Sequence, residues 1–402
     1  MRHVRSVSLL LSFVILFLCF SASRSFADQD TAKLKELTDA LISISVQPSR
    51  SQSAVQALDL AQQREQVLLK IIGKSPHQAF ELLLPSDVVA RLPLEARPHA
   101  ECDADESGEL EILVEDYADG THRMRYFLKT ASERLEMYFV TDPPLKFKTG
   151  DHVRVHGKRL DSIFVLPSTA EALTSDTIAP LQTQTLTTSN TFGEQSTVGL
   201  LINFTGNPAE PTTVEAAREM VFTTVSNFDR ENSQDQTWLT GDVFGWFTVP
   251  LDGVTCLHNS VATLGEQAAT AAGVNLANYH RIVYMFPTIP QCGWLGLGTI
   301  GGDPSRAWID GLVTDPMVAA HEMGHNFGLL HSHTAEDEYG DLFDTMARWT
   351  NGHYNAFQKE RLGWLNYGSS NPITTVTASG TYSITPAVES GYSLRPASNP
   401  IN

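Results

Sequence analysis

Basic residues, cysteines and long apolar runs are all scarce in this chain of 402 residues. Only 28 lysines and arginines stand against 46 acidic residues, so the formal net charge is −18. This balance argues against charge-driven binding to nucleic acid or to an anionic membrane surface. Beyond the N-terminus no run is apolar enough to cross a bilayer, so we expect no stable membrane insertion. The composition is neither disordered nor collagen-like.

The one apolar run, Leu9–Phe20, follows a basic start and predicts a signal peptide over residues 1–27. Small residues precede the expected cleavage after Ala27. The alternative is an uncleaved anchor, for which the run is short. Residues 1–27 hold three arginines and no acid, so the mature chain has 25 basic and 46 acidic residues, a charge of −21. We therefore expect a soluble secreted protein, in an extracellular or periplasmic location.

The small number of cysteines leaves few disulfide pairings open. Cys19 leaves with the signal peptide, and Cys102, Cys256 and Cys292 remain. One pair and one odd thiol is the simplest outcome in an oxidising compartment. We predict the pair Cys256–Cys292, because both lie in the same predicted domain.

The first half of the chain predicts a propeptide. Residues 28–104 should be a helical segment, since Val55, Leu58, Leu68 and Ile72 fall near one helical face. Residues 105–166 alternate apolar and polar side chains in about five short runs, which predicts a small β-barrel prodomain, with the OB type as the candidate barrel. Such barrels often bind oligonucleotides or sugars. The acidic balance favours the other interpretation, a folding or inhibitory prodomain.

The second half changes to a mixed α/β pattern. Residues 167–197 are rich in Ser, Thr and Gln and predict a linker where a propeptide is cut. Residues 198–368 should form the catalytic domain, an α/β (α+β) fold with a twisted sheet and an active-site helix that begins at Pro316, with Thr314 or Asp315 as its cap. Thr212 with Glu215 predicts a capping box for an earlier helix. Residues 369–402 read as the start of a C-terminal β region.

One motif carries the predicted chemistry: His321-Glu322-Met323-Gly324-His325-Asn326-Phe327-Gly328-Leu329-Leu330-His331. His321 and His325 lie four residues apart, so a helix projects both imidazoles from one face. Gly328 allows a sharp turn with positive φ, which brings His331 round as a third ligand. Three imidazoles and an open fourth position describe one catalytic Zn²⁺.

Glu322 follows the first ligand and is the predicted general base and acid. A zinc ion lowers the pKa of a bound water towards ~7. Glu322 can take the proton of that water and later hand it to the leaving amine. The alternative, three histidines on an unrelated helix, does not account for the extended spacing.

The motif resembles that of metzincin metallopeptidases, and within them the chain is similar to the gametolysin family. The likeness also rests on Tyr339-Gly340-Asp341, on Tyr354-Asn355-Ala356 and on Leu362-Gly363-Trp364-Leu365. It covers roughly residues 198–368. It implies a metzincin-type catalytic domain, a secreted zymogen and a protein or glycoprotein substrate, with Met346 in a tight turn beneath the metal. Some metzincins carry a zinc-binding tyrosine two residues after that methionine; here the position is Arg348.

Weaker signals leave alternatives open. Cys102 could bind the zinc and hold the enzyme latent, but its acidic neighbours make it a poor thiolate ligand. His333 is a rival of His331 that the spacing disfavours. The acidic run Glu336–Asp344 reads as a solvated loop, or as a Ca²⁺ site or a preference for basic substrates. Trp294–Gly302 could be the edge strand that aligns an extended substrate.

Two other classes of function remain. One is a zinc amidase that acts on a non-protein amide such as peptidoglycan, with nearly identical chemistry. The other is a non-catalytic glycan-binding zinc protein, against which the intact Glu322 argues. The sequence therefore predicts a secreted zinc endopeptidase, with these two as alternatives.

Overall fold

The structure is a computed structural model. It describes residues 29–44, 51–143, 146–167, 173–175, 190–311, 313–347, 352–365 and 378–381. The predicted signal peptide, most of the predicted linker, Arg348 and most of the C-terminal β region lie outside these residues. Among the described residues, no helix combines the length and the apolarity that a membrane span requires.

The chain divides into two compact units, and their boundaries interleave along the sequence. Unit 1 holds Met1–Glu109, Tyr126–Leu145 and His152–Ile178, whereas unit 2 holds Leu110–Arg125, Lys146–Asp151 and Ala179–Asn402. Two short pieces from inside the stretch 105–166 therefore pack with the second half of the chain.

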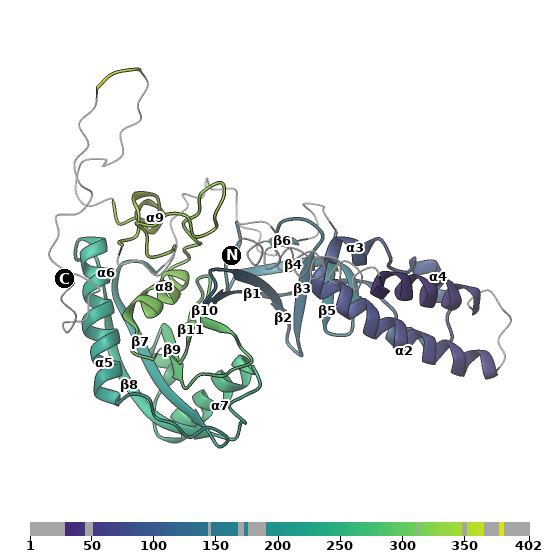
Figure 1. Ribbon diagram of the computed structural model, residues 1–402, viewed down its shortest axis with the longest axis horizontal. Helices are drawn as coiled ribbons and strands as arrows, with labels where there is room; N and C mark the ends of the chain where they lie inside the picture. Colours follow the sequence, from purple (N-terminus) through teal and green to yellow (C-terminus); the bar gives the residue numbers. More distant parts are fainter. Residues whose placement is uncertain are drawn as a thin grey trace, which may run out of the picture. The chain divides into compact units, whose positions relative to one another are not determined.

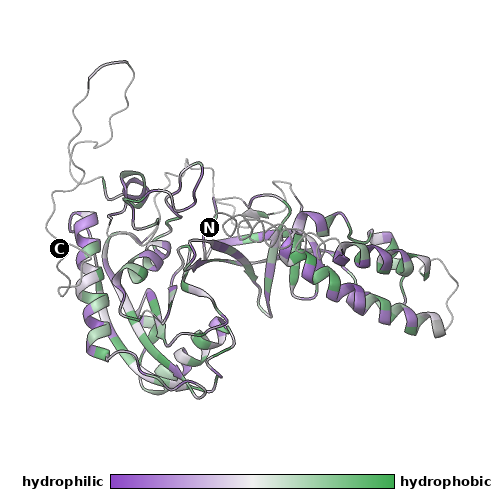
Figure 2. Ribbon diagram, viewed as in Figure 1, coloured by the Kyte–Doolittle hydropathy of each residue, from purple (hydrophilic) through white to green (hydrophobic). Residues whose placement is uncertain are grey.

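Helices make up the N-terminal part of unit 1. A helix over residues 29–44 precedes α2 (Ser51–Lys74), α3 (Pro76–Phe80), α4 (Ser86–Arg91) and the 3₁₀ turn η1 (Arg97–His99). Hydrophobic and hydrophilic residues alternate along α2 (Figure 2). Leu68 and Ile72 are buried, as the helical pattern predicts, but Val55 is 71% exposed. The alanines Ala57 and Ala61 form the buried stripe at that end of α2 instead.

The strands that build unit 1 follow these helices, and the parts of the first two that fall within Leu110–Arg125 belong to unit 2. They are β1 (Cys102–Tyr117), β2 (His122–Lys129), β3 (Arg134–Phe139), β4 (His152–Leu160), β5 (Ile163–Leu166) and β6 (Leu173–Ser175). Their order is β6-β4-β5-β3-β2-β1, and β4 also pairs with β1 through Cys102–Glu109, so five strands close into a ring. Buried and exposed side chains alternate along β4, which is the pattern of a half-buried strand. An OB-type barrel stays a prediction.

Unit 2 is built on a mixed sheet. Its strands follow the order β1-β10-β11-β9-β7-β8, with β7 (Gly193–Phe204), β8 (Thr237–Val249), β9 (Arg281–Phe286), β10 (Trp294–Thr299) and β11 (Ser305–Asp310). β8, β7, β9 and β11 are parallel. β10 runs antiparallel to β11, and the C-terminal half of β1 runs antiparallel to β10. The expected mixed α/β fold is confirmed.

Helices cover both faces of this sheet (Figure 1). The stretch α5 (Val214–Glu219), η2 (Met220–Val225) and α6 (Ser226–Ser233) shares one core with α8 (Pro316–Asn326). α7 (His258–Ala271) packs on the opposite face, where its Gly265 contacts Ile202. The 3₁₀ turn η3 (Leu276–Asn278) and α9 (Ala356–Leu362) complete the unit. The cap of α5 is Thr213, which accepts from the Ala216 amide, and not the predicted Thr212.

A disulfide joins Cys256, just before α7, to Cys292, just before β10. Cys102 is an exposed free thiol at the start of β1, in the ladder with β4. The structure thus has the pair and the odd thiol that the cysteine count predicts.

Candidate metal centre

Helix α8 positions the first two histidines. Its cap is Asp315, whose Oδ1 accepts hydrogen bonds from the amides of Met317 at 2.9 Å and Val318 at 3.4 Å. Pro316 stands at the first helical position, where no amide hydrogen is needed. The helix ends at Asn326, and Gly328 follows with φ 92°, the positive value that the sharp turn requires.

The structure brings His321, His325 and His331 together. Their ring centroids lie 4.9 to 5.3 Å apart, and all three side chains are buried. His333, the rival by position, is exposed and faces the carbonyl of Thr334. The turn at Gly328 thus directs His331 inward.

The hydrogen bonds of the Nδ1 atoms determine which ring nitrogen of each histidine faces the centre of the three-histidine group. Nδ1 of His321 lies 2.8 Å from the carbonyl oxygen of Thr345, and Nδ1 of His325 lies 2.8 Å from that of Leu329. A carbonyl oxygen only accepts hydrogen bonds, so both Nδ1 atoms must donate. Nδ1 of His331 lies 3.4 Å from the carboxylate of Glu338. In a neutral imidazole this arrangement leaves Nε2 with its lone pair directed inward, as metal binding requires.

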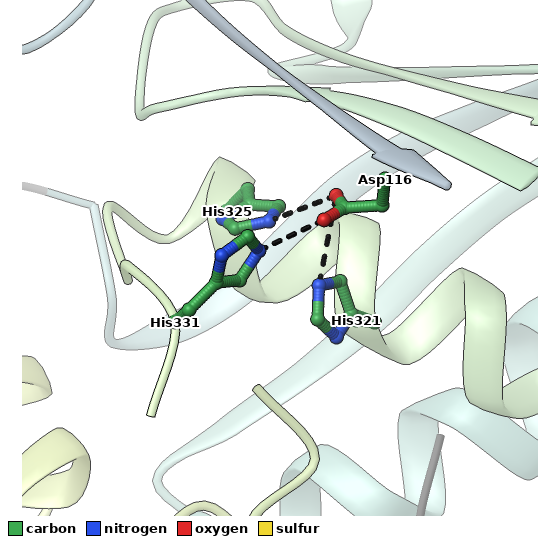
Figure 3. Close-up of side chains that lie close together, drawn as sticks. All are labelled: Asp116, His321, His325 and His331. Atoms are coloured by element: carbon green, nitrogen blue, oxygen red, sulfur yellow. Dashed lines mark ion pairs between the residues drawn. The ribbon is translucent and has the colours of Figure 1, made fainter. Parts of the chain in front are cut away.

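A fourth side chain, Asp116 of β1, lies among the three histidines (Figure 3). Its carboxylate oxygens lie 2.9 Å from Nε2 of His331, 3.3 Å from that of His325 and 3.7 Å from that of His321. The Tyr339 hydroxyl donates a hydrogen bond to Asp116 Oδ1. Sequence reasoning missed Asp116, because no local spacing relates it to the motif.

The donor set fits a zinc ion. The ligand atoms of Asp116, His321, His325 and His331 all lie within 4.8 Å of one another. Three inward lone pairs and a buried carboxylate repel one another unless a cation or a proton lies between them. Imidazole nitrogen with one carboxylate oxygen is a set that zinc accepts in tetrahedral geometry. Of the predicted acidic run, Glu338 alone belongs to a metal-capable group among the described residues, and the Ca²⁺ site stays a prediction.

The pKa values show how charges balance at this centre without a cation. Burial lowers the pKa of His325 to about 4. For His331 burial also acts downward, but the charge of Asp116 together with the hydrogen bonds to Asp116 and Glu338 outweighs it and raises the pKa to about 9. Burial acts to raise the pKa of Asp116, yet the charges of His331 and His321 hold it well below its usual range. A proton on His331 and a bound cation are alternative ways to neutralise the buried carboxylate.

Glu322 lies on α8 beside this group. It is fully buried, and neither carboxylate oxygen receives a hydrogen bond from the described residues. Burial first, and then the charge of Asp116, raise its pKa well above the usual value. The carboxyl fits there because β10 carries glycine opposite it: a Cβ on Gly296 would lie 1.9 Å from Glu322 Oε1. Glu322 is thus a buried carboxyl directly beside the histidines and Asp116.

Met346 lies in the core of unit 2, next to the helix that carries His321 and His325. It is fully buried, and a Cβ on Gly324 would lie 2.3 Å from its sulfur, so the helix approaches the methionine closely at a glycine. The turn is held by Asp344, whose Oδ1 accepts from the Met346 amide at 2.6 Å. The adjacent carbonyl of Thr345 is the partner of His321. Met346 therefore packs against the helix that carries His321 and His325, and its role in a turn beneath a metal stays a prediction.

The comparisons with known proteins agree with this centre at the level of family. The sequence model of the gametolysin peptidase M11 family matches residues 167–392. None of the curated proteins compared with the sequence matches it.

Two solved structures give only distant likenesses. One is a chaperone–substrate complex, at 14% identity and TM-score 0.29, where the match covers 53% of this chain and 33% of the other. The second is metalloproteinase-II from Bacteroides fragilis, at 8% identity and TM-score 0.29, with 64% of this chain and 90% of the other covered. At such TM-scores neither likeness carries an argument about the site.

Proposed function

Because this chain belongs to the gametolysin peptidase M11 family, we propose that it is a secreted zinc-dependent endopeptidase. The observation that carries the proposal is the inward-facing Nε2 triplet of His321, His325 and His331 with Glu322 beside it. A peptidase needs both parts, since a structural or glycan-binding zinc site has no use for a buried carboxyl next to the metal.

The protein residues divide the work. The three histidines would hold Zn²⁺, which when bound supplies Lewis acidity at the scissile carbonyl and makes water more acidic. Glu322 takes the proton of the attacking water and delivers it to the leaving nitrogen. The carbonyls of Thr345 and Leu329 keep the rings of His321 and His325 in the ligating tautomer.

Strand β10 would align the substrate. Its outer side accepts an extended segment antiparallel, as the pairing of Leu113–Tyr117 with β10 demonstrates. A protein or glycoprotein chain bound there in the same way would pass next to Glu322, because Gly296 lies in β10 against that carboxyl. Main-chain pairing of this kind favours an endopeptidase, since it reads extended backbone rather than a chain end.

Secretion and a metzincin-type zymogen complete the proposal. The N-terminal apolar run and the Cys256–Cys292 disulfide both suit an oxidising compartment outside the cytoplasm. N-terminal sequencing of the protein recovered from the medium tests this part: we expect a start at or after Asp28, and a retained Met1 would contradict it.

Glu322→Gln tests the chemistry. The expected result for the chain activated by limited proteolysis is a ~10²–10⁴-fold lower rate of gelatin hydrolysis, because the general base is lost. Zinc content, measured by mass spectrometry, should stay at the wild-type level. Glu360→Gln, on the exposed face of α9, is the matched control and should keep full activity.

Other outcomes of these assays distinguish the endopeptidase from the alternative functions. Gelatin hydrolysis that survives both Glu322→Gln and a zinc chelator would contradict the assigned chemistry. A wild type that binds zinc, spares gelatin and small peptides but cleaves peptidoglycan amides would replace the endopeptidase with the amidase.

A further inference from the structure

The segment Leu110–Arg125 lies inside the predicted prodomain in sequence but belongs to unit 2 in the structure. Its strand pairs with β10 in the register Leu113–Thr299, Val114–Gly298, Glu115–Leu297, Asp116–Gly296 and Tyr117–Trp294. It therefore occupies the outer side of β10, which the proposed function reserves for substrate.

A second piece, Lys146–Asp151, fastens the strand in place. The Thr149 hydroxyl accepts from the Ile112 amide at 3.0 Å, and the Thr149 amide donates to the Ile300 carbonyl at 2.8 Å. Thr149 thus bridges β1 to the end of β10. These contacts add to the main-chain ladder and hold β1 against a competing extended chain.

The register sets the position of one side chain. Asp116 stands opposite Gly296, the residue whose missing side chain makes room for Glu322. From there Asp116 reaches all three histidines, is fully buried and is held by the Tyr339 hydroxyl. Of the described residues, no cysteine belongs to a metal-capable group, so the exposed Cys102 is not the residue at the centre.

We infer that Asp116 is a built-in fourth ligand of the zinc site, and that strand Leu113–Tyr117 keeps the intact chain latent by filling both the coordination position and the substrate position. This inference rests on the proposed function for its zinc ion. Three histidines with an open position make a catalytic site, whereas a fourth protein ligand closes it. Because one run of five residues closes both positions, its displacement opens both at once.

The experiment measures access to the metal rather than activity. The intact full-length chain, loaded with Co²⁺ in place of zinc, is titrated with acetohydroxamate, a small bidentate metal ligand, and the visible absorption of the cobalt is followed. In the wild type we expect weak binding. In Asp116→Ala we expect at least about tenfold tighter binding and a changed cobalt spectrum before any ligand is added, because one protein oxygen has left the coordination sphere.

Two variants keep the result interpretable. Asp105→Ala removes an exposed carboxylate from the same strand, where it pairs with Arg154, and should behave as the wild type. Asp116→Asn keeps the shape of the side chain and should fold even if Asp116→Ala does not; it should bind the hydroxamate more tightly than the wild type. Circular dichroism reports folding for each variant.

The outcomes separate the inference from the proposed function. Equal hydroxamate affinity and identical cobalt spectra in the wild type and both Asp116 variants would overturn the inference. Opening of the site by Asp116→Ala, in a chain that never hydrolyses protein after proteolytic activation, would support the inference and refute the endopeptidase.

Discussion

Two segments of unit 2 meet at the same histidines, and they differ in how they arrive there. Helix α8 and its turn, over residues 315–331, bring three ligands through local geometry: a cap, a four-residue spacing and a glycine with positive φ. Strand β1 brings Asp116 to the histidines because it pairs with β10, a segment far away in the sequence. Tyr339, whose hydroxyl donates a hydrogen bond to Asp116, is 223 residues distant. Local periodicity therefore reveals the ligands of the helix, whereas nothing local reveals the ligand of the strand.

The two segments also differ in which property a single substitution should abolish, metal binding or the blocked access to the metal. The helix ligands are buried, and Met323 and Phe327 of the same segment belong to the main core of unit 2. The strand lies on the outer side of β10, a place where any extended chain can pair. The helix side should thus determine whether metal binds, and the strand side whether it is accessible.

The largest expected effect comes from the helix side. His325→Ala should lower zinc affinity by more than the ~10–100-fold typical of losing an outer-shell partner, because a ligand itself is lost. Equilibrium dialysis against a zinc buffer measures it. His280→Ala, an exposed histidine paired with Asp303, is the control and should retain zinc. If the zinc affinity of His325→Ala equals that of the wild type, His325 is not a zinc ligand, and the helix does not determine whether metal binds.

The next effect tests the strand on which both segments pack. Gly296→Ala places a methyl group at 1.9 Å from Glu322 Oε1, so the carboxyl must move. We expect a loss of about 1–3 kcal/mol in the free energy of unfolding, measured by urea denaturation, together with lower peptidase activity. Gly73→Ala, which meets no atom within 4 Å, should be neutral or slightly stabilising. A neutral Gly296→Ala would mean that Glu322 does not approach β10 this closely.

The smallest expected effect concerns Asp310, a second buried aspartate in the sheet that holds Asp116. Burial raises the pKa of Asp310 to about 7, against a hydrogen bond from the Ile289 amide that acts to lower it. The unfolded chain loses this proton near its ordinary pKa of 3.8, but the folded chain keeps it until about 7. The stabilising contribution is therefore full at low pH and is lost as the pH rises through this window.

Asp310→Asn should remove this pH dependence. Between about pH 5 and pH 8 the variant should gain on the order of 2 kcal/mol of unfolding free energy relative to the wild type. Urea denaturation at both pH values measures the gain, with exposed Asp303→Asn as control. An unchanged difference would show that Asp310 is ionised throughout, and that its environment compensates its charge as the histidines compensate that of Asp116.

Some features of the fold and of the metal centre could be predicted from the sequence, and others could not. The strand alternation in 105–166, the cap at Asp315 and the turn at Gly328 were readable because each depends on residues within one or two turns of the chain. The exposed Val55 was misjudged because the choice of buried face belongs to the packing partners of α2. Gly296 and Tyr339 gave no signal of their role, since each acts on a residue in another element.

The sequence by itself determined the three histidines, Glu322 and the order in which the helix and its turn present them, because the rise and period of a helix make these relations local. Only the tertiary structure decided that Asp116 faces those histidines. Strand pairing joins residues at any separation, and a register shift of one residue would have turned Asp116 to the other face of the sheet.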